Sequence, residues 1–146
     1  MAYMLQALVA RSGDFPKELP ARLQVVHLQA GLDMVPLTSH ALKLLGIPLL
    51  PITDEGEVKL PASLAALCAE LSANARLGYI EAEYFGGAGN QAHSLFNLGT
   101  PAGEPLVADD AINQALRFLG ISKGEALDEF DAVGLGQQRE TNEWLA

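Results

Sequence analysis

Residues 79–91 constrain the fold of this chain more than any other segment. Residues 79–85 (Tyr-Ile-Glu-Ala-Glu-Tyr-Phe) have the aromatic, alternating character of a strand, and three glycines follow within four residues. Because glycine adopts positive φ without steric cost, such a run either turns a hairpin or lines a site that another group approaches closely. Residues 92–98 again have strand composition. We therefore predict an antiparallel hairpin with the glycines between its strands.

The segments before this hairpin predict a mixture of strands and helices. Residues 3–11, 22–28 and 32–37 have the composition and alternation of strands. Residues 40–45 and 62–74 have the apolar spacing and the end signals of helices, with Gly46 closing the first of them.

The last third of the chain predicts one further helix, which begins at a cap supplied by Asp109 or Asp110 and ends at Gly120. Residues 121–146 are polar with a few apolar anchors, so we expect irregular or short helical structure packed on the domain. Strands and helices follow one another without strict βαβ order. The prediction is therefore α+β: a single domain, residues 1–146, with a mainly antiparallel sheet and two or three helices. The predicted core contains Leu67, Leu71, Ile80, Ala82, Ile112, Leu116 and Leu119.

The acidic composition excludes several classes of function. The chain has 18 acidic and 9 basic residues, a net charge of −9, and no run of lysine or arginine. Partners that carry phosphate need a basic patch, so neither nucleic acid nor an anionic membrane surface is an expected partner. The single cysteine, Cys68, excludes a disulfide framework and a multi-cysteine zinc site. No apolar stretch is long enough to span a membrane, and we expect a cytoplasmic protein without metal or cofactor.

The glycine run at Gly86, Gly87 and Gly89 leaves two interpretations open. It follows a strand, as a nucleotide-binding loop does. It lacks, however, the third glycine of the dinucleotide-binding pattern and the Gly-Lys-Ser/Thr of a phosphate loop. The run is therefore either a hairpin turn or a loop that binds another kind of ligand, with Gln91 as a further candidate contact.

Glu81 and Glu83 are a candidate pair of functional carboxylates. The two-residue period of a strand places them on one face, about 6–7 Å apart, together with Tyr79 and Phe85. Such a pair either lines a solvated face of the sheet or serves a ligand or acid–base chemistry beside the glycines. We expect His93 to lie opposite the glutamates across the hairpin.

Asp128, Glu129 and Asp131 form a second candidate site, with three acidic residues in four positions. From Glu104 onward the chain has nine acidic and three basic residues, so most of its excess negative charge lies in the last third. These side chains either form a solvated acidic loop or attract a cationic partner by electrostatic steering. Their spacing does not match the calcium loop of an EF-hand.

Several segments carry a resemblance to a known family. The sequences E-A-E-Y-F-G-G-A-G-N-Q (81–91), I-N-Q-A-L-R (112–117) and D-E-F-D-A-V-G-L-G (128–136), with residues 29–38, resemble a family of small bacterial proteins without a known activity. The resemblance covers most of the chain and implies a bacterial, cytoplasmic setting. It implies no catalytic residue.

Two functions are consistent with these observations. The first is a non-catalytic binding protein, such as a toxin-neutralising immunity protein whose acidic surface covers a basic site of its partner. The second is an enzyme or small-ligand-binding protein that uses the Glu81/Glu83 face beside the glycine run. The lack of an active-site signature in the sequence favours the first.

Overall fold

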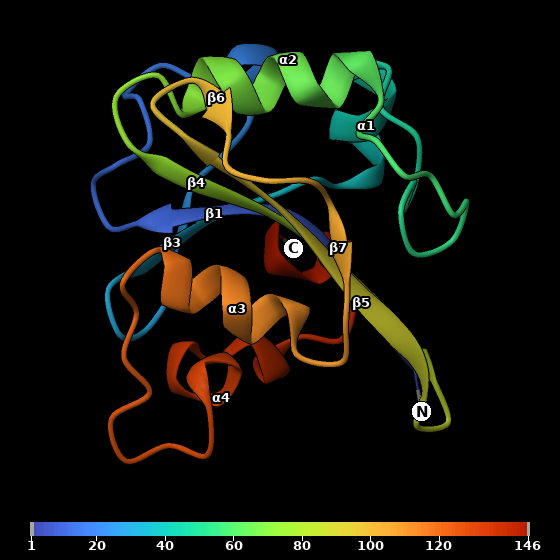
Figure 1. Ribbon diagram of the computed structural model, residues 1–146, viewed down its shortest axis with the longest axis vertical. Coiled ribbons are helices and arrows are strands. Elements are labelled where there is room, and N and C mark those ends of the chain that lie inside the picture. Colours follow the sequence, from blue (N-terminus) through green and yellow to red (C-terminus); the bar gives the residue numbers. More distant parts are fainter. Residues whose placement is uncertain (1, 146) are drawn as a thin grey trace.

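The computed structural model describes residues 2–145, which form an antiparallel sheet with helices on both faces (Figure 1). The strands are β1 (Ala2–Arg11), β2 (Val26–His27), β3 (Leu32–Pro36), β4 (Arg76–Phe85), β5 (Ala88–Asn97), β6 (Thr100–Pro101) and β7 (Leu106–Val107). The helices are α1 (Ser39–Leu45), α2 (Ala62–Leu71), α3 (Ala111–Phe118) and α4 (Glu129–Val133). The predicted α+β class with an antiparallel sheet is confirmed, and one helix more than predicted is present.

The strand order is β2-β3-β1-β4-β5-β6, and β7 also pairs with β5. Every named pair of strands is antiparallel. The longest strands, β1, β4 and β5, therefore lie at the centre of the sheet, and the short β6 and β7 pair with different parts of the outer edge of β5.

The sheet separates two apolar cores. Helices α1 and α2 cover one face, where Leu64, Leu67 and Leu71 of α2 pack with residues of the sheet (Figure 1). Helices α3 and α4 cover the other face, where Ile112 and Leu116 pack. All seven residues of the predicted core are buried. They do not form one cluster, however, because Leu67 and Leu71 lie on the opposite side of the sheet from the other five.

The predicted hairpin is confirmed, with a shorter turn than the sequence indicated. β4 and β5 are joined by Gly86 and Gly87 alone, whose φ values of 59° and 85° suit a two-residue turn with a left-handed backbone at both positions. Gly89 lies inside β5, where an added Cβ would come within 2.0 Å of the carbonyl oxygen of Glu83. Two of the glycines therefore make the turn, and the third permits a close approach of the two strands.

The segments next to β1 depart from the prediction at one place. The strand expected over residues 22–28 is reduced to β2, because the chain first makes a 3₁₀ turn at Pro20–Arg22 with positive φ at Ala21 and Arg22. The strand β3 then returns as predicted and pairs with residues 7–11 of β1.

The C-terminal segment completes the remaining edge of β1. Residues 121–145 form α4 and two 3₁₀ turns, Leu135–Gln137 and Thr141–Leu145. The Met4 amide donates to the carbonyl oxygen of Arg139 at 2.8 Å, and the Gln6 amide donates to Thr141 Oγ1 at 3.0 Å. The expectation of short helical structure packed on the domain is met. None of the helices within residues 2–145 is long and apolar enough to cross a membrane.

Candidate functional site

Glu81 does not line a solvated face, because α1, α2 and the segment between them cover that side of β4. Its side chain is 0% exposed. The carboxylate accepts hydrogen bonds from the Ile52 amide (3.2 Å), the Thr53 amide (2.8 Å), Thr53 Oγ1 (2.9 Å) and the Tyr79 hydroxyl (2.5 Å). Its acceptor positions are therefore occupied by the protein itself, and the solvated-face interpretation is wrong for this residue.

Gln6 of β1 extends this buried hydrogen-bond network to Pro48 and Leu50, at the start of the segment between α1 and α2. Its amide nitrogen donates to the Tyr79 hydroxyl at 3.0 Å and to the Pro48 carbonyl oxygen at 3.2 Å, while its amide oxygen accepts from the Leu50 amide at 3.1 Å. Burial, together with the Glu81 carboxylate, holds the pKa of the Tyr79 phenol well above its ordinary value, so the hydroxyl remains a donor. Gln6, Tyr79 and Glu81 thus fix the segment between α1 and α2 to the sheet.

Glu83 lies at the margin of this network and is partly exposed. Its pKa is raised from 4.5, first because burial disfavours the charged form and then because the carboxylates of Asp54 and Glu81 are near. Ionised Glu83 is therefore less favourable in the folded protein than in the unfolded chain.

We expect the substitution Glu83→Gln to raise the free energy of unfolding near neutral pH and to have little effect below pH 4.5. A raised pKa in the folded state means that the folded state holds the proton more tightly. The stabilisation from this group is therefore present at low pH and is lost as the pH rises through the folded-state pKa. Urea unfolding of both proteins across this range measures the difference. A difference that grew as the pH fell would contradict the assignment.

His93 lies on the opposite face of the sheet from the glutamates. The two-residue turn sets a register that pairs Glu81 with Ala92 and Ile80 with His93. His93 is buried, and its Nε2 lies 3.1 Å from the side-chain oxygen of Gln114 on α3. The expectation that His93 lies opposite the glutamates is wrong, because its partner Ile80 has its side chain on the other face of β4 from Glu81 and Glu83.

Gln91 caps the helix that an aspartate was expected to cap. Its side-chain oxygen accepts from the Ile112 amide at 2.7 Å, and its nitrogen donates to the Tyr84 hydroxyl at 3.0 Å. Asp110 occupies the N-cap position of α3, but its side chain makes no capping hydrogen bond. Gln91 thus ties β5 to the start of α3. Gly86 and Gly87 lie at the exposed tip of the hairpin.

The three acidic residues of the second candidate site have different surroundings. Asp128 caps α4 by accepting from the Asp131 amide at 2.8 Å, and it also accepts from the side chain of Asn113 at 3.2 Å. Glu129 is buried, and its carboxylate lies 3.0 Å from the guanidinium of Arg117. Asp131 is exposed. Glu129 therefore already has a cation within the protein, whereas Asp128 and Asp131 form no ion pair within residues 2–145.

A pocket of about 230 Å³ brings together Gln91 and Asp128, which the sequence had placed in separate candidate sites. Here the start of α3 meets the ends of β1, β4 and α4. The lining consists of Tyr3, Ala82, Tyr84, Gln91, Asp109, Ile112, Asn113, Asp128 and Phe130. We call it the α3 pocket. Sequence reasoning missed Tyr3 and Asp109 as lining residues, because only the folded sheet brings them near Asp128.

The α3 pocket has the chemistry of a site for a cation. Two carboxylates, Asp109 and Asp128, and three aromatic rings line it, and no lysine, arginine or histidine does. The rings of Tyr3 and Phe130 meet edge to face with centroids 5.7 Å apart. Carboxylates accept hydrogen bonds from ammonium and guanidinium groups, and aromatic faces attract them.

The described part of the chain has neither a metal-binding cluster nor an exposed thiol. Within residues 2–145, no cluster of three or more His, Cys, Asp or Glu side chains is arranged to hold a metal ion. Cys68 is buried on α2, and burial raises the pKa of its thiol far above the ordinary value. Comparisons of the chain with protein-family models, curated proteins and solved structures gave no match. Function is therefore inferred from the site itself.

Proposed function

We propose that this protein is a non-catalytic binding protein whose partner presents a lysine or arginine side chain to the α3 pocket. The observation that carries the proposal is the convergence of Asp109 and Asp128 with the rings of Tyr3, Tyr84 and Phe130 in one pocket without a basic residue. Each kind of group attracts a cation, and together they favour an ammonium or guanidinium group with a short apolar stem.

The distribution of charge supports the same proposal. Arg117 of α3 already lies within 3.4 Å of the Asp110 carboxylate and 3.0 Å of the Glu129 carboxylate. It therefore pairs with acidic residues outside the pocket lining, and Asp109 and Asp128 form no ion pair within residues 2–145. The net charge of −9 would speed the approach of a basic partner at low ionic strength.

A toxin-neutralising immunity protein in the bacterial cytoplasm is the specific form of this proposal. Such a protein covers a basic functional site of its toxin, and a lysine or arginine of that site would enter the α3 pocket. The alternative, a ligand or catalytic site on the Glu81/Glu83 face, has less support, because four donors of the protein already occupy the Glu81 carboxylate.

A titration followed by NMR tests the proposal with a matched pair of small probes. N-acetyl-arginine amide carries the cation, and N-acetyl-citrulline amide has the same shape without the charge. We expect only the arginine probe to shift the amide signals of Ala82, Gln91 and Asn113, and we expect added salt to weaken the effect, because the Debye length is about 8 Å at physiological ionic strength.

The double variant Asp109→Asn/Asp128→Asn should abolish these shifts while the fold is retained, since asparagine also serves as an N-cap on α4. The control is Glu55→Gln/Glu57→Gln, which changes the net charge equally on the exposed segment before α2. Equal loss of binding in both variants would show that only net charge matters and would contradict a site at the α3 pocket. So would equal binding of the two probes.

The same variants identify the partner when they are used as bait in extracts of the native host. A basic protein that is retained by the wild type and by the Glu55/Glu57 control, but not by the Asp109/Asp128 variant, is the expected result. Retention by all three proteins would place the interface elsewhere.

A further inference from the structure

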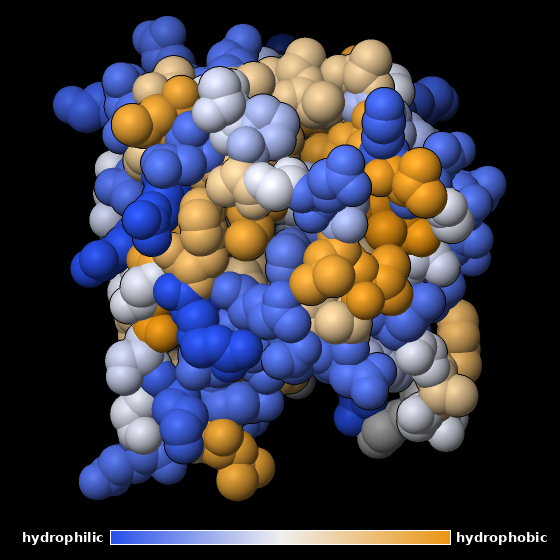
Figure 2. Space-filling view, in the orientation of Figure 1, coloured by the Kyte–Doolittle hydropathy of each residue, from blue (hydrophilic) through white to orange (hydrophobic). Residues whose placement is uncertain are grey.

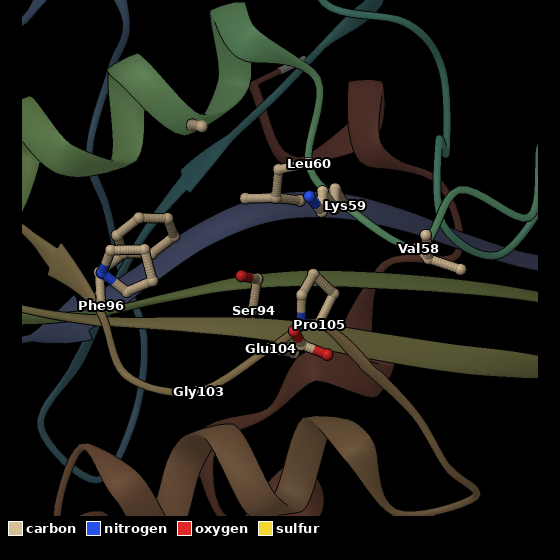
Figure 3. Close-up of a pocket in the computed structure, with 10 residues that line it drawn as sticks. Val58, Lys59, Leu60, Ser94, Phe96, Gly103, Glu104 and Pro105 are labelled. Atoms are coloured by element: carbon tan, nitrogen blue, oxygen red, sulfur yellow. The ribbon is translucent and has the colours of Figure 1, made fainter.

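A second pocket, of about 260 Å³, lies on the other face of the sheet, between the start of α2 and the segment that joins β6 to β7 (Figure 3). Its floor is formed by Ser94 and Phe96 of β5. We call it the β5 pocket. Its lining consists of Val58, Lys59, Leu60, Ala65, Ser94, Phe96, Pro101, Gly103, Glu104 and Pro105.

The walls of the β5 pocket are largely apolar. Val58 and Leu60 contribute one side, and Pro105 contributes the other (Figure 3). Pro101 also lines the pocket. Figure 2 shows apolar surface on the same side of the molecule, over β7 and over the segment that leads into α2. Lys59 and Glu104, both exposed, bring one charge of each sign to the rim. The pocket therefore favours a neutral, mainly apolar ligand.

Ser94 supplies the polar group at the floor of this pocket. Its side chain projects from β5 into the space between Leu60 and Pro105 (Figure 3). The residue is 2% exposed and lines the pocket, so its hydroxyl is within reach of a group that enters there. A serine hydroxyl can both donate and accept a hydrogen bond, so Ser94 can bond a hydroxyl group of a ligand in this pocket.

We propose that the β5 pocket binds a small neutral aromatic molecule with a single hydroxyl group, that is, a simple phenol. A dry apolar cavity of about 150 Å³ is enough for benzene. The β5 pocket is larger than such a cavity and has room for one substituted ring. The ring would lie against Phe96 and the prolines, and its hydroxyl would bond Ser94 Oγ. This site is separate from the α3 pocket, and the inference does not depend on the proposed function.

The experiment compares p-cresol with toluene, which has the same ring and methyl group without the hydroxyl. In a titration followed by NMR, both should shift the amide signals of Ser94 and Phe96. We expect p-cresol to bind about 3–10-fold more tightly than toluene, because its hydroxyl makes one additional hydrogen bond to Ser94 and a bond of this kind increases affinity by about that factor. The substitution Ser94→Ala should remove this preference and leave toluene binding unchanged.

A substitution that fills the pocket tests its location. Ala65 of α2 lines the pocket, and Ala65→Leu should abolish binding of both probes, whereas Ala66→Leu, at the exposed neighbouring position of the same helix, should not. Leucine is a good helix former, so both variants should fold, which circular dichroism would verify. Binding of the probes to Ala65→Leu would overturn the proposal.

Two further measurements separate this inference from its rivals. N-acetyl-tyrosine methylamide carries the same phenol on a peptide backbone, and tighter binding of this probe than of p-cresol would overturn the small-molecule proposal in favour of a peptide partner. The Asp109→Asn/Asp128→Asn variant should bind p-cresol as the wild type does. A loss of p-cresol binding there would contradict the separation of the two pockets.

Discussion

Replacing Glu81 with alanine is expected to lower the free energy of unfolding by about 3 kcal/mol or more. The change removes the common acceptor of the Ile52 amide, the Thr53 amide and the Tyr79 hydroxyl, in a region where Glu81 itself is fully buried. Each buried donor left without a partner costs about 1–3 kcal/mol. Urea unfolding followed by circular dichroism provides the measurement.

The exposed residue Glu57 provides the control, and Glu57→Ala should change stability by less than about 0.5 kcal/mol. Hydrogen exchange adds a local test, because the amides of Ile52 and Thr53 should lose protection in Glu81→Ala before the rest of the sheet does. Similar stability of the two variants would mean that the network does not hold the segment between α1 and α2.

Truncating Leu116 to alanine is expected to cost about 2–5 kcal/mol, the range found for fully packed leucines. Leu116 is 0% exposed and lies with Ile80 and Ile112 in the core beneath α3. Leu127→Ala provides the contrast, since Leu127 is 87% exposed and should contribute little to the monomer. Thermal and urea unfolding compare the two. A small loss for Leu116→Ala would mean that α3 packs loosely on the sheet.

Elements with local signals were predicted well from the sequence. The β4–β5 hairpin follows from strand composition around the glycines, and α1 follows from Thr38 and Gly46, which cap its two ends as their residue types suggest. These signals are local because the side chain or backbone that ends the element lies within a few residues of it.

The surroundings of the candidate residues could not be predicted in the same way. Alternation along β4 correctly placed Glu81 beside Tyr79, but it gave no information about what covers that face. Both faces of this sheet are covered by helices, so a polar residue on β4 need not point to solvent. Gln91 and Asp128 meet only through the packing of β5 against α3 and α4. The β5 pocket was missed for the same reason, because residues 99–105 indicate only a loop.

The edge of β1 that residues 139–141 complete has a consequence for how the protein is made. β1 precedes the other described strands in the sequence and lies in the middle of the sheet, yet the amides of Met4 and Gln6 bond Arg139 and Thr141. In a chain emerging from the ribosome, the amides of Met4 and Gln6 therefore lack these partners until Arg139 and Thr141 have been synthesised. Contacts this distant in sequence slow folding, and an unpaired strand edge invites association with other chains. The hydrogen bonds of β1 seen in the folded protein can therefore be completed only after residue 141 has been synthesised.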